Sequence, residues 1–146
     1  MTYIGIDPGL SGGIAWIRDG HPCAEKMPAT DRDILDLLRG LIREEALGMI
    51  YCALEKVHSM PKQGVTSTFT FGEHFGKLQM ALAALEIPFE FVTPQRWQKA
   101  IGCLTGGDKN VSKAAAQRMF PQVHKITHAT ADALLIAHFC KSTANT

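Results

Sequence analysis

The sequence has no long apolar run, and its first residues do not resemble a secretory leader. None of its apolar stretches approaches the roughly 20 residues that a membrane-spanning helix requires. The first residues pass directly into a strand-like pattern, without the charged and apolar regions of a signal peptide. We therefore expect a cytoplasmic protein with no membrane partner.

Paired cysteines are also missing. The four cysteines, Cys23, Cys52, Cys103 and Cys140, lie far apart and form no Cys-x-x-Cys motif. In a reducing compartment such residues are typical buried thiols, so we expect all four to be buried and unpaired. The six histidines show no zinc-finger spacing with these cysteines, which argues against a structural zinc site.

The chain has little net charge, only +1, whereas nucleic-acid-binding proteins usually carry a basic surplus. The charges are unevenly distributed, however. Basic residues dominate from Arg96 onward, and acidic residues crowd into 31–45. This pattern fits either one basic side or an ordinary mixed surface. With 146 residues, of which 46% are hydrophobic and 20% charged, the chain is typical of one globular domain spanning 1–146.

Apolar periodicity and turn residues predict an α/β fold. Strands are expected at 3–6, 14–17, 22–27, 49–54 and 89–92. Five helices are expected. The first runs from a Thr30 or Asp31 cap to about 42, the second covers 68–85, and the third is a short segment from Pro94. The fourth runs from a Ser112 cap to 119, and the fifth from a Thr127 or Thr130 cap to about 140. The stretch 57–66 has no periodic apolar face and is expected to be a loop. This order predicts a mixed five-stranded sheet with helices on both faces and antiparallel edge strands.

Three widely separated carboxylates are the main functional signal. Asp7 and Glu55 each follow a short apolar strand, and Asp132 begins an apolar helical segment. If the two strands are parallel neighbours, both acids point into the crevice where α/β sheets place their ligands. Clustered carboxylates are typical of sites where divalent cations assist phosphodiester hydrolysis. Singly, each acid also fits a structural role in a turn, at a strand end or at a helix start.

His128 lies four residues before Asp132. If the helix extends that far back, the two side chains share one face, and His128 can ligate metal, orient water or carry a proton. The alternative is a histidine in a capping loop without a catalytic role. Trp97 is interpreted as a packing residue rather than a platform for base stacking.

With these residues in place, the chain resembles the RuvC family of Holliday junction resolvases within the RNase H-like nuclease superfamily, and most of all its short, phage-type branch. Four ordered segments, 3–9, 53–57, 92–97 and 131–137, carry the resemblance. It implies an RNase H-like fold and a homodimer that nicks opposing strands of four-way DNA junctions with Mg²⁺, for which Mn²⁺ can substitute. It also implies a place near the nucleoid, or in the host cytoplasm if the protein is encoded by a phage.

The resemblance also implies roles for particular residues. Asp7, Glu55 and Asp132 match the family's metal-binding acids. His128 is the candidate for a fourth catalytic residue, since position 129 is Ala. The helix after the second acid, with Gly72 and Gly76, would form the dimer interface. The candidate DNA contacts are Lys62 and Gln63 in the loop at the junction centre and Lys109, Lys113 and Arg118, which would meet phosphates.

Other functions remain compatible with the sequence. An RNase H-like nuclease acting on RNA or flap substrates would use the same acids. A non-catalytic junction-binding protein would bind the same DNA without nicking it. The segment 7–13 also resembles a phosphate loop of an ATP-binding module, but such modules need a second lobe, for which the chain is too short.

Overall fold

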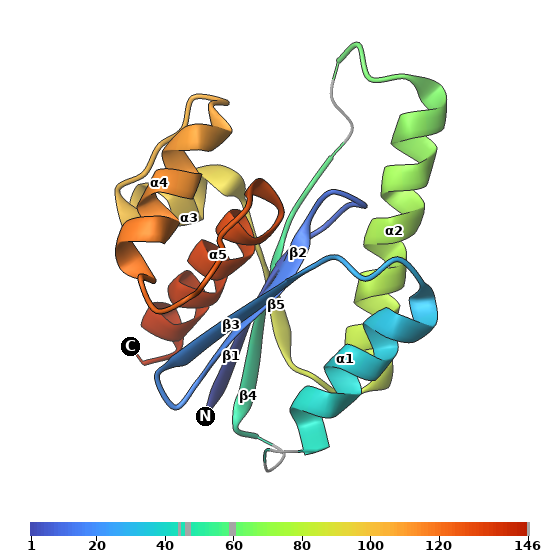
Figure 1. Cartoon of the computed structure of the whole chain (residues 1–146). Coiled ribbons are helices and arrows are strands. Elements are labelled where there is room, and N and C mark those ends of the chain that lie inside the picture. The colour runs from blue at the N-terminus through green and yellow to red at the C-terminus, as the bar shows by residue number, and fades with distance from the viewer. Residues whose placement is uncertain (44, 46–47, 59–60, 146) are drawn as a thin grey trace.

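The computed structural model describes residues 1–43, 45, 48–58 and 61–145. Its centre is a five-stranded sheet with the order β3-β2-β1-β4-β5 (Figure 1). The strands are β1 (Thr2–Asp7), β2 (Gly13–Arg18), β3 (His21–Lys26), β4 (Ile50–Glu55) and β5 (Phe89–Val92). β1, β2 and β3 pair antiparallel, whereas β1, β4 and β5 pair parallel. The predicted mixed sheet is confirmed, although the antiparallel edge is confined to the β3 side.

Helices cover both faces of the sheet, as predicted (Figure 1). α1 (Asp31–Arg43) and α2 (Val65–Ala84) lie on one face, and α3 (Pro94–Ile101), α4 (Lys109–Met119) and α5 (His128–Ala144) lie on the other. The core has two parts because side chains on a strand alternate between faces. Ile4 and Ile6 of β1 pack with α1 and α2, while Tyr3 packs in the cluster that contains α5.

Gly5 brings α5 into direct contact with the central strand. A Cβ atom at Gly5 would lie 2.2 Å from the backbone nitrogen of Ala137 and 2.3 Å from the carbonyl oxygen of Ala133. Only glycine leaves room for this approach. Because the close contact fixes α5 against β1, it also fixes Asp132 beside the carboxyl end of β1.

Several predicted helix boundaries need correction. α2 begins at Val65 rather than Thr68, so the predicted loop is shorter; its residues 59 and 60 lie outside the described residues. The first turn of α2 is exposed, and it therefore carries no apolar periodicity. α4 is capped by Asp108, whose side chain accepts a hydrogen bond from Asn110 N–H at 2.9 Å. The predicted cap, Ser112, is instead buried within that helix.

The other two predicted caps agree with the structure. Thr30 accepts a hydrogen bond from Asp33 N–H and so caps α1. Thr127 and Thr130 together form a capping box at the start of α5. This helix continues to Ala144, beyond the predicted end near residue 140.

The four cysteines are free, and three of them are buried as predicted. The prediction was wrong for Cys23, which is exposed. Cys23 lies on the edge strand β3, most of whose residues are exposed or only half-buried. Within the described part of the chain, no helix combines the length and the apolar character needed to cross a membrane.

Candidate metal centre

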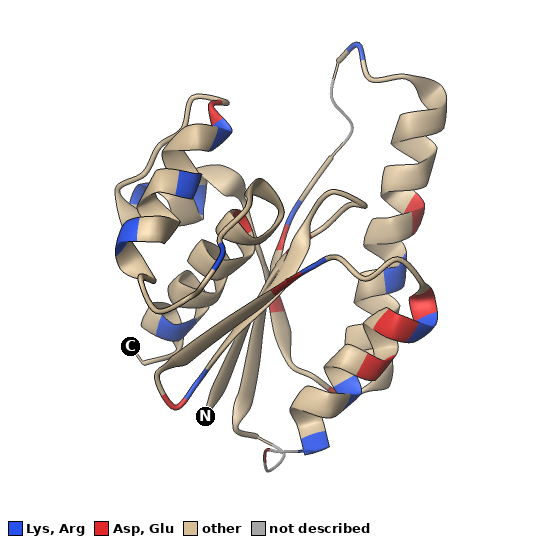
Figure 2. Cartoon of the chain, in the orientation of Figure 1, with Lys and Arg blue, Asp and Glu red and all other residues tan. Residues whose placement is uncertain are grey.

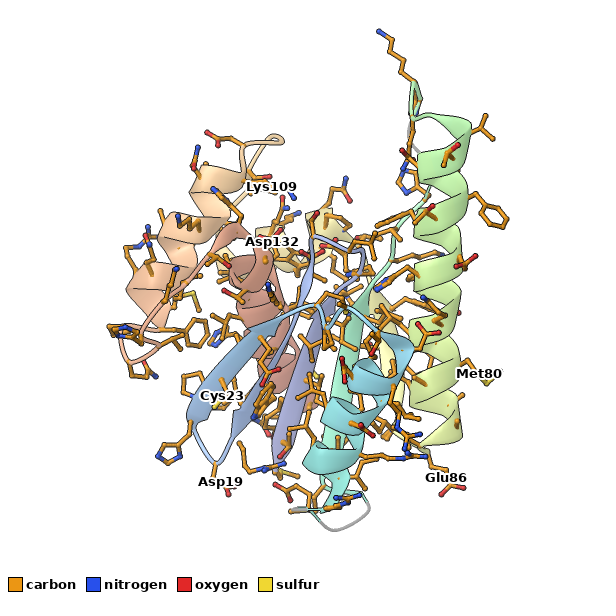
Figure 3. The ribbon with its side chains drawn as sticks, turned by 45° about the vertical axis from the view of Figure 1, so that its right-hand side comes forward. Asp19, Cys23, Met80, Glu86, Lys109 and Asp132 are labelled. Atoms are coloured by element: carbon orange, nitrogen blue, oxygen red, sulfur yellow. The ribbon has the colours of Figure 1, made fainter. Side chains whose placement is uncertain are left out.

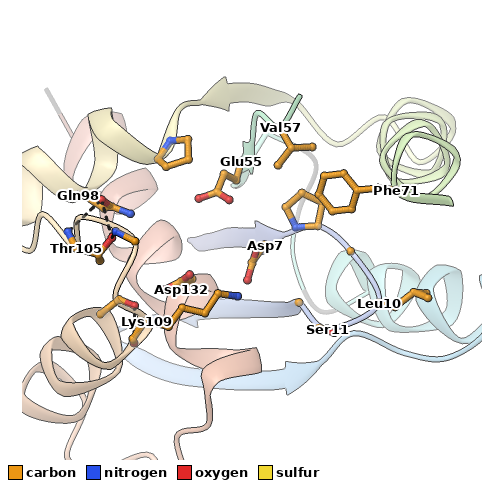
Figure 4. Close-up of a pocket in the computed structure, with 16 residues that line it drawn as sticks. Asp7, Leu10, Ser11, Glu55, Val57, Phe71, Gln98, Thr105, Lys109 and Asp132 are labelled. Atoms are coloured by element: carbon orange, nitrogen blue, oxygen red, sulfur yellow. Dashed lines mark hydrogen bonds between the residues drawn. The ribbon is translucent and has the colours of Figure 1, made fainter. Parts of the chain in front are cut away.

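Asp7, Glu55 and Asp132 line one cavity of about 390 Å³. Ile6 of β1 and Leu54 of β4 are register partners, so Asp7 and Glu55 end neighbouring parallel strands at the same edge of the sheet. Asp132 enters from α5, which packs on β1. Figure 4 shows the three carboxylates directed into the space between them. The fold therefore brings together the three acids on which the sequence interpretation depends.

Glycines shape the turn that follows Asp7. Gly9 has a φ of +108°, a conformation that side chains disfavour. A Cβ at Gly12 would lie 2.0 Å from the carbonyl oxygen of Asp7, and Gly12 N–H donates to the carbonyl oxygen of Gly9 at 3.0 Å. The turn folds back tightly on Asp7 and forms part of the wall of the cavity.

Glu55 is a buried carboxylate held by a buried indole. Its Oε2 accepts a hydrogen bond from Trp97 Nε1 at 2.6 Å, and Glu55 is only 8% exposed. Burial raises the pKa of Glu55 to about 7, with a further contribution from the Asp132 charge, while the Trp97 hydrogen bond and Lys109 act in the opposite direction. The packing interpretation of Trp97 is confirmed, since the side chain is fully buried. Sequence reasoning missed its contact with Glu55.

The electrostatics of the cavity favour a bound cation. Burial raises the pKa of Asp7 well above its ordinary value, and the charges of Glu55 and Asp132 raise it further, opposed by Lys109. Asp132 Oδ1 is buried and has no hydrogen-bond partner among the described residues. Asp7 and Glu55 are desolvated carboxylates close to the Asp132 charge, and a positive charge between them would stabilise their ionised forms.

The acids of the cavity fit magnesium by the chemistry of their donor atoms rather than by enclosing an ion completely. In the described part of the chain, no three His, Cys, Asp or Glu side chains stand close enough together to enclose one ion. Magnesium, however, is usually bound through one or two carboxylates, with water and substrate phosphate completing its coordination. The unpartnered Asp132 Oδ1 and the oxygens of Asp7 and Glu55 are ligands of the type that magnesium prefers. The donor set therefore fits this ion.

Lys109, the first residue of α4, also lines the cavity. Figure 3 shows it near Asp132, and Figure 4 shows its side chain extending among the carboxylates. Its charge lowers the pKa values of Asp7 and Glu55. Lys109 was predicted to contact phosphate, and the structure places it beside the acids.

The remaining candidate residues lie outside this cavity. His128 is the first residue of α5, so it does share a helix with Asp132, but it is exposed and absent from the cavity wall. Its catalytic role stays a prediction. Lys113 and Arg118 continue along α4. Lys62 is exposed before α2, and Gln63 lines a neighbouring cavity with Leu10 and Phe71.

Basic residues lie on both faces of the sheet (Figure 2), and α1 itself carries Arg32, Arg39 and Arg43. Lys and Arg residues are spread over α3, α4 and α5, whereas acidic residues gather on α1 at the other face. We call the surface of α3, α4 and α5, where basic residues outnumber acidic ones, the basic side, whereas α1 has a mixed surface. Lys109 links that side to the cavity lined by Asp7, Glu55 and Asp132, which we call the candidate metal cavity.

Comparison with known proteins identifies the fold. No family model and no curated protein matches the sequence. Two solved structures of Thermus thermophilus RuvC are similar to this chain, and one of them is described as a complex with a Holliday junction substrate. Each has a TM-score of 0.66 and 17% identity, and the match covers 100% of this chain and 98% of the other. The chain therefore has a RuvC-like, RNase H-like fold, as predicted.

Proposed function

We propose that this protein is a magnesium-dependent endonuclease that resolves four-way DNA junctions. The observation that carries the proposal is the convergence of Asp7, Glu55 and Asp132 in one cavity of a RuvC-like fold. A structure of the same fold described as a complex with a Holliday junction substrate supports the choice of substrate class. The short, phage-type branch of the family remains part of the proposal on sequence resemblance.

The residues of the cavity have distinct roles in this proposal. Magnesium, or manganese in its place, would activate water and stabilise the leaving oxygen during phosphodiester hydrolysis. Asp7, Glu55 and Asp132 supply oxygen ligands. Trp97 holds one oxygen of Glu55 and so leaves the other to face the cavity. Lys109 offers a positive charge to a phosphate that enters beside the acids.

DNA would approach over the basic side. Lys109 and Lys113 are one helical turn apart, so they share a face of α4. Together with Arg118 they would contact phosphates, which position DNA without reading its sequence. Lys62 and Gln63, before α2, would contact the branch point. His128 would assist proton transfer or water orientation at the edge of the site.

A homodimer would explain the exposed face of α2. Its outward stripe contains Val65, Phe69 and Met80, which are 89%, 71% and 68% exposed. Gly72 and Gly76 lie in the same stripe, and a Cβ at either position would meet nothing within 4 Å. Apolar residues flanking two small ones suit close helix–helix packing, here with a second copy of the chain. Two sites in one dimer would permit symmetric nicking.

The test is cleavage of a labelled four-way junction with Mg²⁺ by the wild type, Asp7→Asn and Asp33→Asn. Asp33 is an exposed acid on α1 and serves as a matched control. The proposal predicts paired nicks for the wild type and the control, with binding but no cleavage for Asp7→Asn. Undiminished cutting by Asp7→Asn would contradict the site. Preferential cutting of flaps or RNA–DNA hybrids would contradict the substrate, and tight binding without nicking by the wild type would indicate a non-catalytic protein.

A further inference from the structure

His74 is a buried histidine in the middle of α2, only 3% exposed. Its Nδ1 accepts a hydrogen bond from the backbone N–H of Gly9 at 3.1 Å. Gly9 belongs to the turn that follows Asp7, and 65 positions separate the two partners. This contact ties the helix to the chain segment that determines where the Asp7 carboxylate points.

Phe71 reinforces the contact from the same side of α2. A Cβ at Gly9 would lie 2.8 Å from Phe71 Cε2, so the ring packs directly on the turn. Phe71 and Leu10 line both the candidate metal cavity and a neighbouring cavity of about 310 Å³, whose wall includes His74. Pro8 and Gly9 are buried in the turn, and Gly9 is held against α2, whereas Leu10 is exposed.

The chemistry of the ring shows what His74 contributes. Because Nδ1 accepts a hydrogen bond, the neutral ring carries its proton on Nε2. Nε2 is buried and has no hydrogen-bond partner among the described residues. Burial and the nearby Lys77 charge lower the pKa of His74, whereas the Asp31 charge acts in the opposite direction. The lowered pKa keeps the ring neutral near neutral pH, so Nδ1 remains an acceptor.

An unpaired buried donor opposes folding. An apolar side chain of similar size would fill the space and remove the unpaired Nε2–H, but it would leave the buried Gly9 N–H without an acceptor. Filling the space therefore does not by itself account for a histidine. What the imidazole adds is an acceptor at the Nδ1 position, aimed at Gly9 N–H.

We propose that His74 is a positioning residue: through Nδ1 it fixes Gly9 and thereby holds the turn that directs Asp7 into the candidate metal cavity. The kinetic consequence rests on the proposed nuclease function, whereas the structural consequence does not. The opposite side of α2 carries the apolar stripe of Val65, Phe69 and Met80. The same helix would therefore connect the dimer contact to the site.

Three variants separate positioning from packing. His74→Asn keeps an acceptor close to the Nδ1 position, His74→Gln places its acceptor near the Nε2 position, and His74→Leu removes both. For the metal-free proteins, hydrogen exchange of the Gly9 amide is measured by NMR, Mn²⁺ affinity by electron paramagnetic resonance, and the thermal midpoint by calorimetry. For the magnesium-loaded proteins, kcat and KM are measured on a four-way junction.

We expect the Gly9 amide to be protected in the wild type and in His74→Asn, and to exchange faster in His74→Gln and His74→Leu. In the latter two, Mn²⁺ affinity and kcat should fall on the order of tenfold to a hundredfold, because small displacements of reacting groups slow catalysis steeply. KM should stay unchanged, and the thermal midpoint of His74→Leu should stay near that of the wild type, because the variant removes the unpaired Nε2–H and leaves Gly9 N–H unpaired in its place.

The proposal is overturned if Gly9 exchange is the same in all four proteins, if His74→Asn is as impaired as His74→Leu, or if kcat simply follows the thermal midpoint. A wild type that cuts no branched DNA would contradict the nuclease function. In that case Gly9 exchange and Mn²⁺ affinity would still decide whether His74 positions the Asp7 turn.

Discussion

Replacing Glu55 by Gln should stabilise the metal-free protein above neutral pH while abolishing cleavage. Folding raises the pKa of Glu55 from 4.5 to about 7, chiefly through burial. The folded protein then binds more protons than the unfolded chain between these values, so stability falls as the pH rises through this window. The shift is 7 − 4.5 = 2.5 pKa units. At about 1.36 kcal/mol per unit, the full effect is about 3 kcal/mol.

Gln removes this effect because its amide is neutral at every pH, and its carbonyl oxygen can still accept the hydrogen bond from Trp97. Urea denaturation of the two proteins in a chelator measures the difference at about pH 5 and about pH 8.5. We expect Glu55→Gln to be more stable than the wild type by up to about 3 kcal/mol at the higher pH and nearly equal at the lower. Glu90→Gln, a change at an exposed position on β5, is the control and should show no such difference.

The reasoning is refuted if Glu55→Gln has no advantage at the higher pH, or if its advantage is the same at both pH values. Either result would mean that the Glu55 carboxylate is not destabilised by burial. Magnesium should reduce the advantage, since the ion stabilises the ionised carboxylate of the wild type and gains less from the amide.

Three further predictions concern single contacts. Trp97→Phe should weaken Mn²⁺ binding and raise the pKa of Glu55, because the hydrogen bond that it removes stabilises the charged carboxylate by about 1.5–3 kcal/mol. Carbon NMR measures this pKa, and an unchanged value would contradict the contact. Lys109→Ala should lower kcat more than it lowers junction affinity. Lys113→Ala should instead lower the affinity and reduce the salt dependence of binding by about one ion, as the loss of a phosphate contact does. Equal effects of the two variants would contradict the placement of Lys109 in the cavity. Gly76→Leu should be a monomer in sedimentation experiments. Gly40→Leu, which places the same side chain at an open position on α1, should remain a dimer. A dimeric Gly76→Leu would contradict the α2 interface.

The fold was largely predictable because its signals are local. The strands β1, β4 and β5 are short and mostly apolar, and the helices between them indicate parallel pairing. The hairpin-like links to β2 and β3 indicate the antiparallel part of the mixed sheet. The errors arose where local signals compete. Ser112 and Asp108 are both good capping residues, and only the structure shows that α4 begins at Lys109. Cysteine side chains are usually buried, but Cys23 lies on a strand at the edge of the sheet, where it is exposed.

The candidate site was predictable to the level of its three acids. Asp7 and Glu55 each end a strand, and parallel neighbours must deliver both to one edge. The residues that hold the site were not predictable in the same way. Trp97 is 42 positions from Glu55, and His74 is 65 positions from Gly9. Such contacts depend on how helices dock on the sheet, which no local pattern records.

The central claim is that Asp7, Glu55 and Asp132 bind divalent cations together. Anomalous diffraction from a crystal soaked in Mn²⁺ tests it most directly. We predict manganese peaks in the cavity at about 2.0–2.2 Å from carboxylate oxygens of these three residues, with Lys109 displaced from among them. An ordered crystal whose cavity holds no manganese, or whose manganese is bound by other residues, would contradict the claim.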